Sequence, residues 1–307
     1  MASTRFRPDR GLSFRMGLTL VLLLLLYLVL AGVVWWIFGG DAGGTGAAVI
    51  AFVLPLGLLW GQWYFSDRLA LAGMRAREVT PEEAPQLHAM VDRLCALADM
   101  PKPRVAVADT DLPNAFATGR SPDRAVVAVT TGLGRRLTDA ELEAVLSHEL
   151  SHVAHRDVTV MTVASSVGVL AGLLMRSALW SSMGGRGRDQ NTGLILLVAT
   201  LVGIVVYAVS FLLTRVLSRY RELAADRAGA ILTGQPANLM SALTKISGDM
   251  ARIPERDLRA AEPYNAFFIY PAFTDKVDFA SLFASHPPLE KRLEQLARLS
   301  RELGQPG

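Results

Sequence analysis

The chain has 307 residues, of which 51% are hydrophobic, and its mean hydropathy is +0.32. A single cysteine, Cys95, excludes an internal disulfide framework and agrees with a reducing compartment. The formal charge of +3 comes mainly from arginine, much of it beside apolar stretches, and it indicates contact with a membrane surface and not nucleic-acid binding.

Four apolar stretches approach or exceed the roughly 20 residues that a helix needs to cross a bilayer. They are Leu18–Phe38, Ala47–Phe65, Val158–Met175 and Gly193–Leu213. The first and the last contain no charged residue, so we predict that both span the membrane. The second contains Pro55 and Gln62, and the third ends at Arg176, so a buried or interfacial hairpin is the alternative for this middle pair.

The positions of the arginines predict how the chain is oriented in the membrane. Arg5, Arg7, Arg10 and Arg15 precede the first stretch, whereas the connection Gly39–Gly46 contains no basic residue. Because loops on the cytoplasmic side carry the excess of Lys and Arg, the N-terminus is predicted to be cytoplasmic. Four spans then place residues 66–157 and 214–307 in the cytoplasm as well. The arginine-rich, alanine-rich composition is typical of a GC-rich bacterium, so we predict a multi-pass protein of the bacterial cytoplasmic (inner) membrane.

The segment between the second and third stretches contains patterns of helix and strand. Pro81–Ala98 reads as a helix and Arg104–Ala108 as a short strand. Two further extended segments, Asn114–Thr118 and Ala125–Thr131, are separated by the turn-forming run Gly119–Asp123. The sequence therefore predicts a small sheet that includes a hairpin.

A second helix is predicted to begin at Thr138, where Thr138 and Glu141 form a capping box. It contains the pentapeptide His148-Glu149-Leu-Ser-His152, which places two imidazoles four residues apart on one helix face with a carboxylate beside them. That arrangement provides two ligands and a general base of a zinc peptidase. The alternative is a helix with two hydrogen-bonded histidines half in the core.

Two imidazoles need at least a third protein ligand, with one position left for water. After the fourth stretch, Glu222 and Asp226 lie four residues apart on a helix that we expect to end near Gly234. We predict that Glu222 binds the metal and that Asp226 accepts a hydrogen bond from a metal-bound imidazole. The alternative for this pair is a solvated helix face partnered by Arg215 and Arg219.

With these motifs the chain resembles the HtpX family of membrane zinc endopeptidases, which are relatives of the CAAX prenyl proteases. The resemblance covers nearly the whole chain and rests on motifs that occur in this order: Asn114-Ala-Phe-Ala-Thr-Gly119, Val129-Thr-Thr-Gly-Leu133, the His148 pentapeptide continued to Asp157, Arg221-Glu222-x-x-Ala225-Asp226, and Ser285-His286-Pro287-Pro288-Leu289-x-x-Arg292.

The resemblance implies a role for each matching residue. His148, His152 and Glu222 would hold one zinc ion per chain, and Glu149 would be the catalytic base. His286 would stabilise the oxyanion, and Arg292 would organise that corner of the site; a plain helix-start residue before Pro287 is the alternative for His286. The edge strand Asn114, Ala115, Phe116 and Ala117 would pair with an extended substrate backbone.

The expected fold is mainly α with a small β-sheet, in which a four-span helical anchor carries a cytoplasmic, zincin-like metalloprotease domain with the HExxH motif. The expected segments are 1–65 (tail and first membrane hairpin), 66–157 (first catalytic part), 158–213 (second membrane hairpin) and 214–307 (second catalytic part).

The expected reaction is attack of zinc-bound water on a peptide bond, assisted by Glu149. The resemblance implies misfolded or membrane-associated polypeptides as substrates, in membrane quality control and the response to stress. The enzymatic alternative is a prenyl-protein protease. The alternatives without catalysis are an inactive relative and a zinc-binding scaffold or transporter, but a transporter should carry ionisable ligands inside its spans.

Overall fold

A computed structural model describes residues 10–38, 53, 56–183, 190–250, 252 and 286–304. The described residues form two compact units: the first contains the described parts of 10–12, 63–159 and 218–304, and the second contains the described parts of 13–62 and 160–217. The connection Gly39–Gly46, the first residues of the predicted span Ala47–Phe65, and Ser285 lie outside the described residues.

The first unit contains a four-stranded mixed sheet with the strand order β1-β2-β4-β3. β2 pairs in parallel with β4, whereas β1 and β3 pair antiparallel with their neighbours. The predicted strand at 104–108 is confirmed, and so is the hairpin of β3 and β4. Its turn contains the 3-10 helix η1 (Pro122–Arg124) and Gly119, whose φ of +127° suits glycine. The strands are β1 (Ala76–Glu78), β2 (Arg104–Ala108), β3 (Ala115–Thr118) and β4 (Val126–Thr130).

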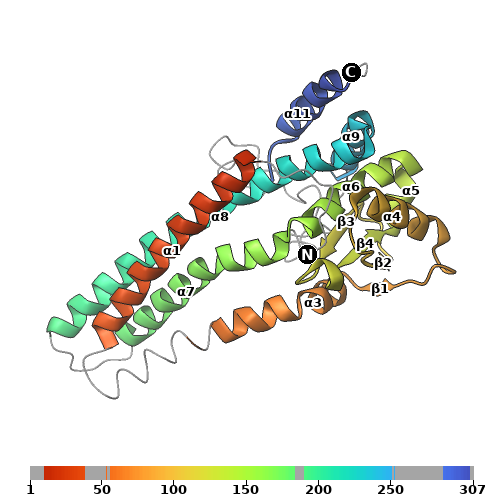
Figure 1. Ribbon diagram of the computed structural model, residues 1–307. Helices are drawn as coiled ribbons and strands as arrows, with labels where there is room; N and C mark the ends of the chain where they lie inside the picture. The colour runs from red at the N-terminus through yellow and green to blue at the C-terminus, as the bar shows by residue number, and fades with distance from the viewer. Residues whose placement is uncertain are drawn as a thin grey trace. The chain divides into compact units, whose positions relative to one another are not determined.

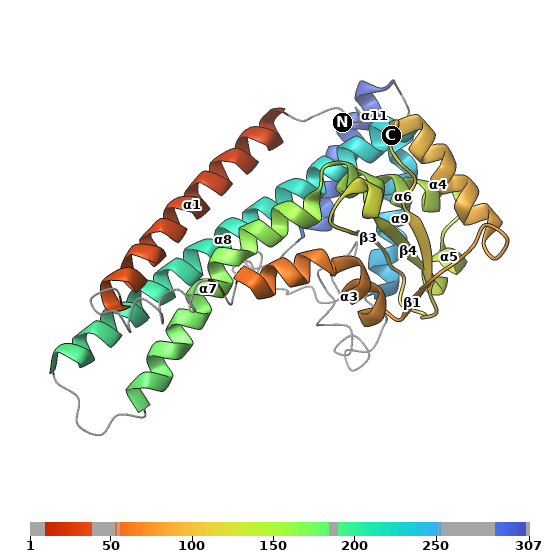
Figure 2. The same cartoon turned by 60° about the horizontal axis from the view of Figure 1, so that its bottom comes forward.

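Both faces of this sheet are covered by other elements. Alternate residues of each strand point to opposite sides, so each strand contributes to two cores. Val105, Val127 and Val129 pack into the larger core, which includes residues of α4 and α6. The intervening Ala106, Val126 and Ala128 pack with Phe116 and Ala70, and Ala70 lies on α3. In Figures 1 and 2 the strands lie beside α3, α4 and α6.

Short helices complete the first unit. The predicted helix over 81–98 is confirmed, although it begins at Pro85, which occupies a first-turn position where its missing N–H costs nothing. The helix predicted to start at Thr138 is also confirmed. The helices of this unit are α3 (Ser66–Gly73), α4 (Pro85–Ala98), α5 (Thr131–Arg136), α6 (Asp139–Ala154), α9 (Pro236–Met250) and α11 (Leu289–Glu302), together with the C-terminal part of α8.

The second unit is helical in the part of the chain that the structure describes. It contains most of α1 (Arg10–Phe38), α7 (Asp157–Met183) and α8 (Gln190–Thr233). Leu23 and Leu30 of α1 pack with Ala164 and Leu170 of α7 and with Val206 of α8, and the three helices run side by side in both views (Figures 1 and 2).

Two described helices are long and apolar enough to cross a membrane, Phe14–Val33 in α1 and Leu197–Thr233 in α8. α6 and α7 meet the same criterion only when taken together, and they are bent by 60° where they meet. Leu24, Leu25 and Leu28 on α1 are more than half exposed, as expected for side chains that face lipid. The described part of the chain is thus mostly helical, with a small mixed sheet and two candidate membrane helices.

Candidate metal centre

The start of α6 is fixed by side chains, which sets the position of the histidines further along. Glu141 Oε2 accepts a hydrogen bond from Thr138 N at 2.8 Å, and the Thr138 hydroxyl caps the N–H of Glu141. Ser241 and Lys245 of α9 donate to the same carboxylate at 2.6 and 2.7 Å. Burial alone would raise the pKa of Glu141, but the bonds from Lys245, Ser241 and Thr138 outweigh it and lower the pKa to about 2. Glu141 therefore joins α6 to α9 as a carboxylate.

A close helix approach brings α8 to the histidines. A Cβ on Gly229 of α8 would lie 2.9 Å from the backbone N of His148, so only glycine fits there without movement. Next to it, the Ser147 hydroxyl donates to the Gly229 carbonyl at 3.1 Å. Glu222, two helical turns earlier on α8, is thereby placed over the histidine face of α6.

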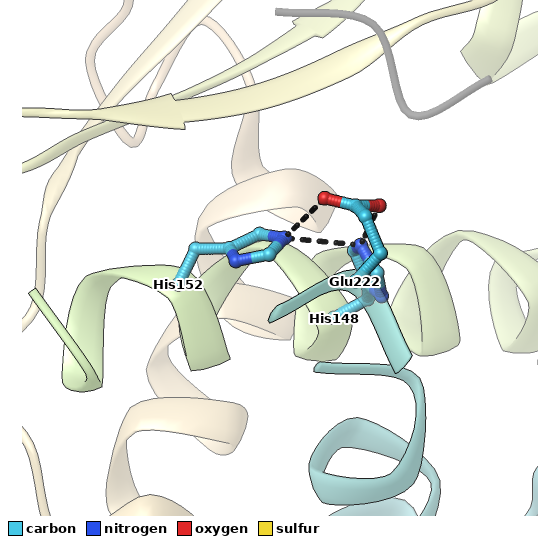
Figure 3. Close-up of side chains that lie close together, drawn as sticks. All are labelled: His148, His152 and Glu222. Atoms are coloured by element: carbon cyan, nitrogen blue, oxygen red, sulfur yellow. Dashed lines mark hydrogen bonds and ion pairs between the residues drawn. The ribbon is translucent and has the colours of Figure 1, made fainter. Parts of the chain in front are cut away.

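Three side chains converge on one point, as Figure 3 shows for His148, His152 and Glu222. The Nε2 atoms of the two histidines are 3.2 Å apart, Glu222 Oε1 lies 3.4 Å from His152 Nε2, and Glu222 Oε2 lies 3.6 Å from His148 Nε2. A tetrahedral zinc with bonds of about 2.0–2.2 Å separates its ligand atoms by about 3.3–3.6 Å. The nearest nitrogen and oxygen atoms of the three side chains lie at separations of this size, and one ligand atom from each lies within 4.8 Å of the other two, so the residues fit a metal ion.

The environment of Glu222 also fits a metal ligand. Its Oε2 is buried and accepts no hydrogen bond from a described residue, and the nearest cation, Arg292 Nη1, is 3.9 Å away, so a bound metal ion would satisfy this oxygen more fully. Glu222 is 8% exposed and Asp226 is fully buried, so the alternative of a solvated helix face is wrong.

The outer nitrogen of His148 faces a buried ion pair. His148 Nδ1 lies 2.9 Å from Asp226 Oδ1. Arg292 of α11 binds Asp226 through two contacts of 2.7 Å, from Nε to Oδ2 and from Nη2 to Oδ1. Arg292 and Asp226 are at most 1% exposed. We call these three residues the His148 arm; in it, Arg292 fixes the carboxylate that orients the imidazole.

A matching set supports His152, and sequence reasoning missed it. His152 Nδ1 lies 2.5 Å from Asp157 Oδ2, and the same oxygen accepts from Arg221 Nη2 at 2.7 Å. We call His152, Asp157 and Arg221 the His152 arm. Asp157 and Arg221 both occur in the motifs that suggested the family, but neither received a role. A signal was available in the sequence, because Asp157 ends the motif that contains His152 and Arg221 directly precedes Glu222.

Glu149 lies on the same helix between the two histidines and is 5% exposed. Its Oε2 accepts a hydrogen bond from the backbone N–H of Ala117 on β3 at 3.0 Å. Burial raises the pKa of Glu149 above its usual range, and the two neighbouring histidines oppose that rise. A carboxyl group placed beside the ligand cluster in this way has the position that a general base requires.

The predicted substrate strand lies at an edge of the described sheet, with β4 as its neighbour. Asn114, Ala115 and Phe116 are at most 2% exposed, and Ala117 is partly exposed. Thr130 N donates to Asn114 O, so the alternation of the ladder directs the backbone groups of Ala115 and Ala117 away from β4. Of these, the Ala117 N–H is bonded to Glu149.

His286 joins the cluster from the segment before α11. Its Nδ1 lies 3.3 Å from Glu222 Oε2, and its side chain is 6% exposed. The structure therefore brings the residues predicted for the metal, for catalysis and for their support, namely His148, Glu149, His152, Glu222, Asp226, His286 and Arg292, to one place in the first unit.

Comparison with known proteins places this arrangement in a family. The sequence pattern described as Peptidase family M48 matches residues 81–300. The chain is 56% identical over 310 residues to "Protease HtpX homolog 1" of Streptomyces coelicolor, covering 98% of this chain and 97% of the relative. It is 54% identical to the "Protease HtpX homolog" of Moorella thermoacetica, with 96% of each chain covered.

Among solved structures, the fold is similar to the crystal structure of S. mikatae Ste24p, with a TM-score of 0.55 and 18% sequence identity. The similarity covers 88% of this chain and 62% of that one, so the chain spans less than two thirds of the solved protein. At this identity the likeness concerns the fold alone.

Proposed function

The chain belongs to peptidase family M48, in the group of HtpX proteases, and on that premise we propose that it is a zinc-dependent endopeptidase of the bacterial cytoplasmic membrane. Family membership and the two apolar helices make it an integral membrane metallopeptidase. The observation that carries the proposal is the meeting of His148, His152 and Glu222, whose nearest nitrogen and oxygen atoms lie 3.2–3.6 Å apart, beside the buried Glu149.

His148, His152 and Glu222 would hold the zinc. A zinc ion in such a site lowers the pKa of water and polarises a carbonyl group. Glu149 takes the proton from the attacking water and delivers it to the departing amine. The Ala117 N–H keeps the Glu149 carboxylate turned toward β3, where we place the extended substrate.

The remaining polar residues position these groups. Asp226 and Arg292 orient His148, and Asp157 and Arg221 orient His152. His286 is close enough to the cluster to donate to an oxyanion that forms there, as the family resemblance implies.

The substrates that we propose are misfolded or membrane-associated polypeptides. The support is the family together with an anchor in the bilayer, because a tethered enzyme meets polypeptides at the membrane surface first. We further propose four spans with the N-terminus and the active site in the cytoplasm, based on the arginines that flank the apolar stretches.

The test uses full-length protein purified in detergent, with zinc content and casein cleavage measured on the same samples. We expect one zinc per chain in the wild type and in Glu149→Gln, with cleavage by the variant reduced by about 10²–10⁴-fold. Glu222→Gln should lose zinc and cleavage together. Glu143→Gln makes the same change on the same helix at a surface ion pair with Arg93 and should leave both unchanged. Full proteolysis by Glu149→Gln would overturn the assignment of the base.

A further inference from the structure

A hollow of about 330 Å³ lies in the first unit, away from the ligand cluster. Four arginines line it: Arg68 on α3, Arg104 on β2, Arg120 in the turn after β3, and Arg124 in η1. Its size is within the range of about 300–1,000 Å³ for sites that bind small molecules. Nothing in the proposed peptidase chemistry uses it.

The arginines of this hollow are incompletely neutralised. Arg104 is paired with Asp67 and Glu78. The other three guanidiniums form no ion pair with a described carboxylate, and Asp123 is the remaining acid in the lining. Three like charges in one hollow repel one another, and an anion would relieve that repulsion.

The position of Arg120 is built by specific contacts. Its Nη1 donates to the carbonyl of Tyr64 at 3.0 Å, and its guanidinium lies 4.0 Å above the Tyr64 ring. The hydroxyl of Thr159 donates to the Arg120 carbonyl at 3.2 Å and accepts from Trp63 Nε1 at 2.9 Å. Arg120 is therefore held in place before any ligand binds, which lowers the entropic cost of binding.

The aromatic residues of this network point to the source of the anion. Trp63, Tyr64 and Phe65 are the last three residues of the apolar stretch Ala47–Phe65, and Trp60 just before them is 59% exposed. Trp and Tyr gather where a span leaves the hydrocarbon and enters the headgroup layer. Basic pockets at that level recognise phospholipid headgroups.

We propose that this hollow binds the phosphate of an anionic phospholipid headgroup, with Arg68, Arg120 and Arg124 as its partners. Arginine suits this ligand because its planar fork donates two parallel hydrogen bonds to phosphate oxygens. Arg120 follows β3 by two residues, so an occupied site would also hold the end of the strand whose Ala117 contacts Glu149.

The test is native mass spectrometry of the full-length, delipidated protein in neutral detergent. The probes are short-chain phosphatidylglycerol, phosphatidylcholine of the same chain length, and inorganic phosphate. We expect phosphatidylglycerol to bind at least tenfold more tightly than the other two. Arg68→Gln/Arg124→Gln should weaken its binding by about 25-fold, or about fivefold for each arginine at an anionic surface. Both side chains are exposed, so the variant should fold normally.

The matched control is Arg298→Gln/Arg301→Gln, which removes the same charge from exposed positions on α11. It should bind phosphatidylglycerol as the wild type does. Equal weakening in the control would show general charge attraction and overturn the site. Unchanged binding in Arg68→Gln/Arg124→Gln would overturn it too. If inorganic phosphate binds as tightly as phosphatidylglycerol, the ligand of the site is free phosphate and the lipid proposal is wrong. None of these results depends on peptidase activity.

Discussion

The two arms that hold the histidines have the same chemistry, but they are built differently. In each, a carboxylate lies against the Nδ1 of one imidazole and an arginine binds that carboxylate. The His148 arm takes Asp226 and Arg292 from distant helices. The His152 arm takes Asp157 from five residues further along the chain.

The arms also differ in burial. In the His148 arm all three side chains are at most 1% exposed, whereas in the His152 arm they are 5–12% exposed. A fully buried charge depends wholly on its partner, while water can partly solvate a charge nearer the surface. The His148 arm should therefore contribute to the stability of the fold, and the His152 arm mainly to the orientation of a ligand.

The largest effect is expected from breaking the more buried His148 arm. Arg292→Met leaves the Asp226 carboxylate buried without its cation and should lower the free energy of unfolding by about 3–5 kcal/mol. Arg221→Met should cost clearly less. Thermal unfolding of the metal-free proteins in detergent, with Arg301→Met as the surface control, measures both. Equal losses in the two arms would remove the distinction between them.

Replacing each carboxylate tests the shared chemistry. Asp226→Asn and Asp157→Asn should each weaken zinc binding by about 10–100-fold, because an oriented, basic imidazole is a better ligand. The loss should be greater for Asp226→Asn, which also leaves Arg292 buried without a counter-charge. Competition with a chelating dye gives the affinities, and Asp92→Asn, at an exposed ion pair with Lys102, should change nothing. Wild-type affinity in either variant would remove that arm from the metal site.

Gly229→Ala tests the contact that seats α8 beside His148. The new Cβ would meet the His148 backbone at 2.9 Å, so α8 must shift, at a cost of about 1–3 kcal/mol. Glu222 should move with it and the zinc affinity should fall. Gly248→Ala in α9 meets no atom within 4 Å and should instead stabilise its helix by up to about 1 kcal/mol. Chemical denaturation measures the stability of the two variants, and zinc titration measures their zinc affinity. A normal zinc affinity in Gly229→Ala would contradict the role of this contact in placing Glu222.

The smallest expected effect lies outside both arms. Glu141→Gln weakens the cap of α6 and should cost about 0.5–2 kcal/mol at neutral pH. Because folding lowers the pKa of Glu141 from 4.5 to about 2, its contribution is complete above pH 4.5 and is lost as the pH falls toward 2. Urea unfolding of both proteins across this range should show their difference shrinking. A difference that grows on acidification would contradict the assignment.

Local sequence patterns correctly predicted helix ends and a strand, because these features depend on residues close together in the sequence. The capping box of Thr138 and Glu141 is present, and α8 ends at Thr233, one residue before Gly234 with its positive φ. The strand at 104–108 was predicted with its exact bounds. By contrast, β1 and the parallel pairing of β2 with β4 were not predicted, since they depend on contacts between segments far apart in sequence.

For the site, spacing and family resemblance named the polar residues that meet at the cluster but missed the His152 arm. Asp157 reaches His152 because Arg156 adopts a positive φ of 56° where α6 gives way to α7. A helical pattern contains no signal for that reversal, because a non-glycine residue rarely adopts it. Arg221 begins a motif but received no role from the sequence, and only the folded chain shows its carboxylate partner, Asp157.

The order of the cluster along the chain has a consequence for biosynthesis. A ribosome makes α6 with its two histidines first, Glu222 on α8 some seventy residues later, and Arg292 on α11 last. A nascent chain that ends before α8 has only two of the three proposed ligand side chains, and one that ends before α11 lacks the cation that balances Asp226. On the proposed assignment, the cluster is therefore complete only late in translation, after α1, α7 and the apolar part of α8 have been made, and a half-synthesised chain should be unable to cleave peptide bonds.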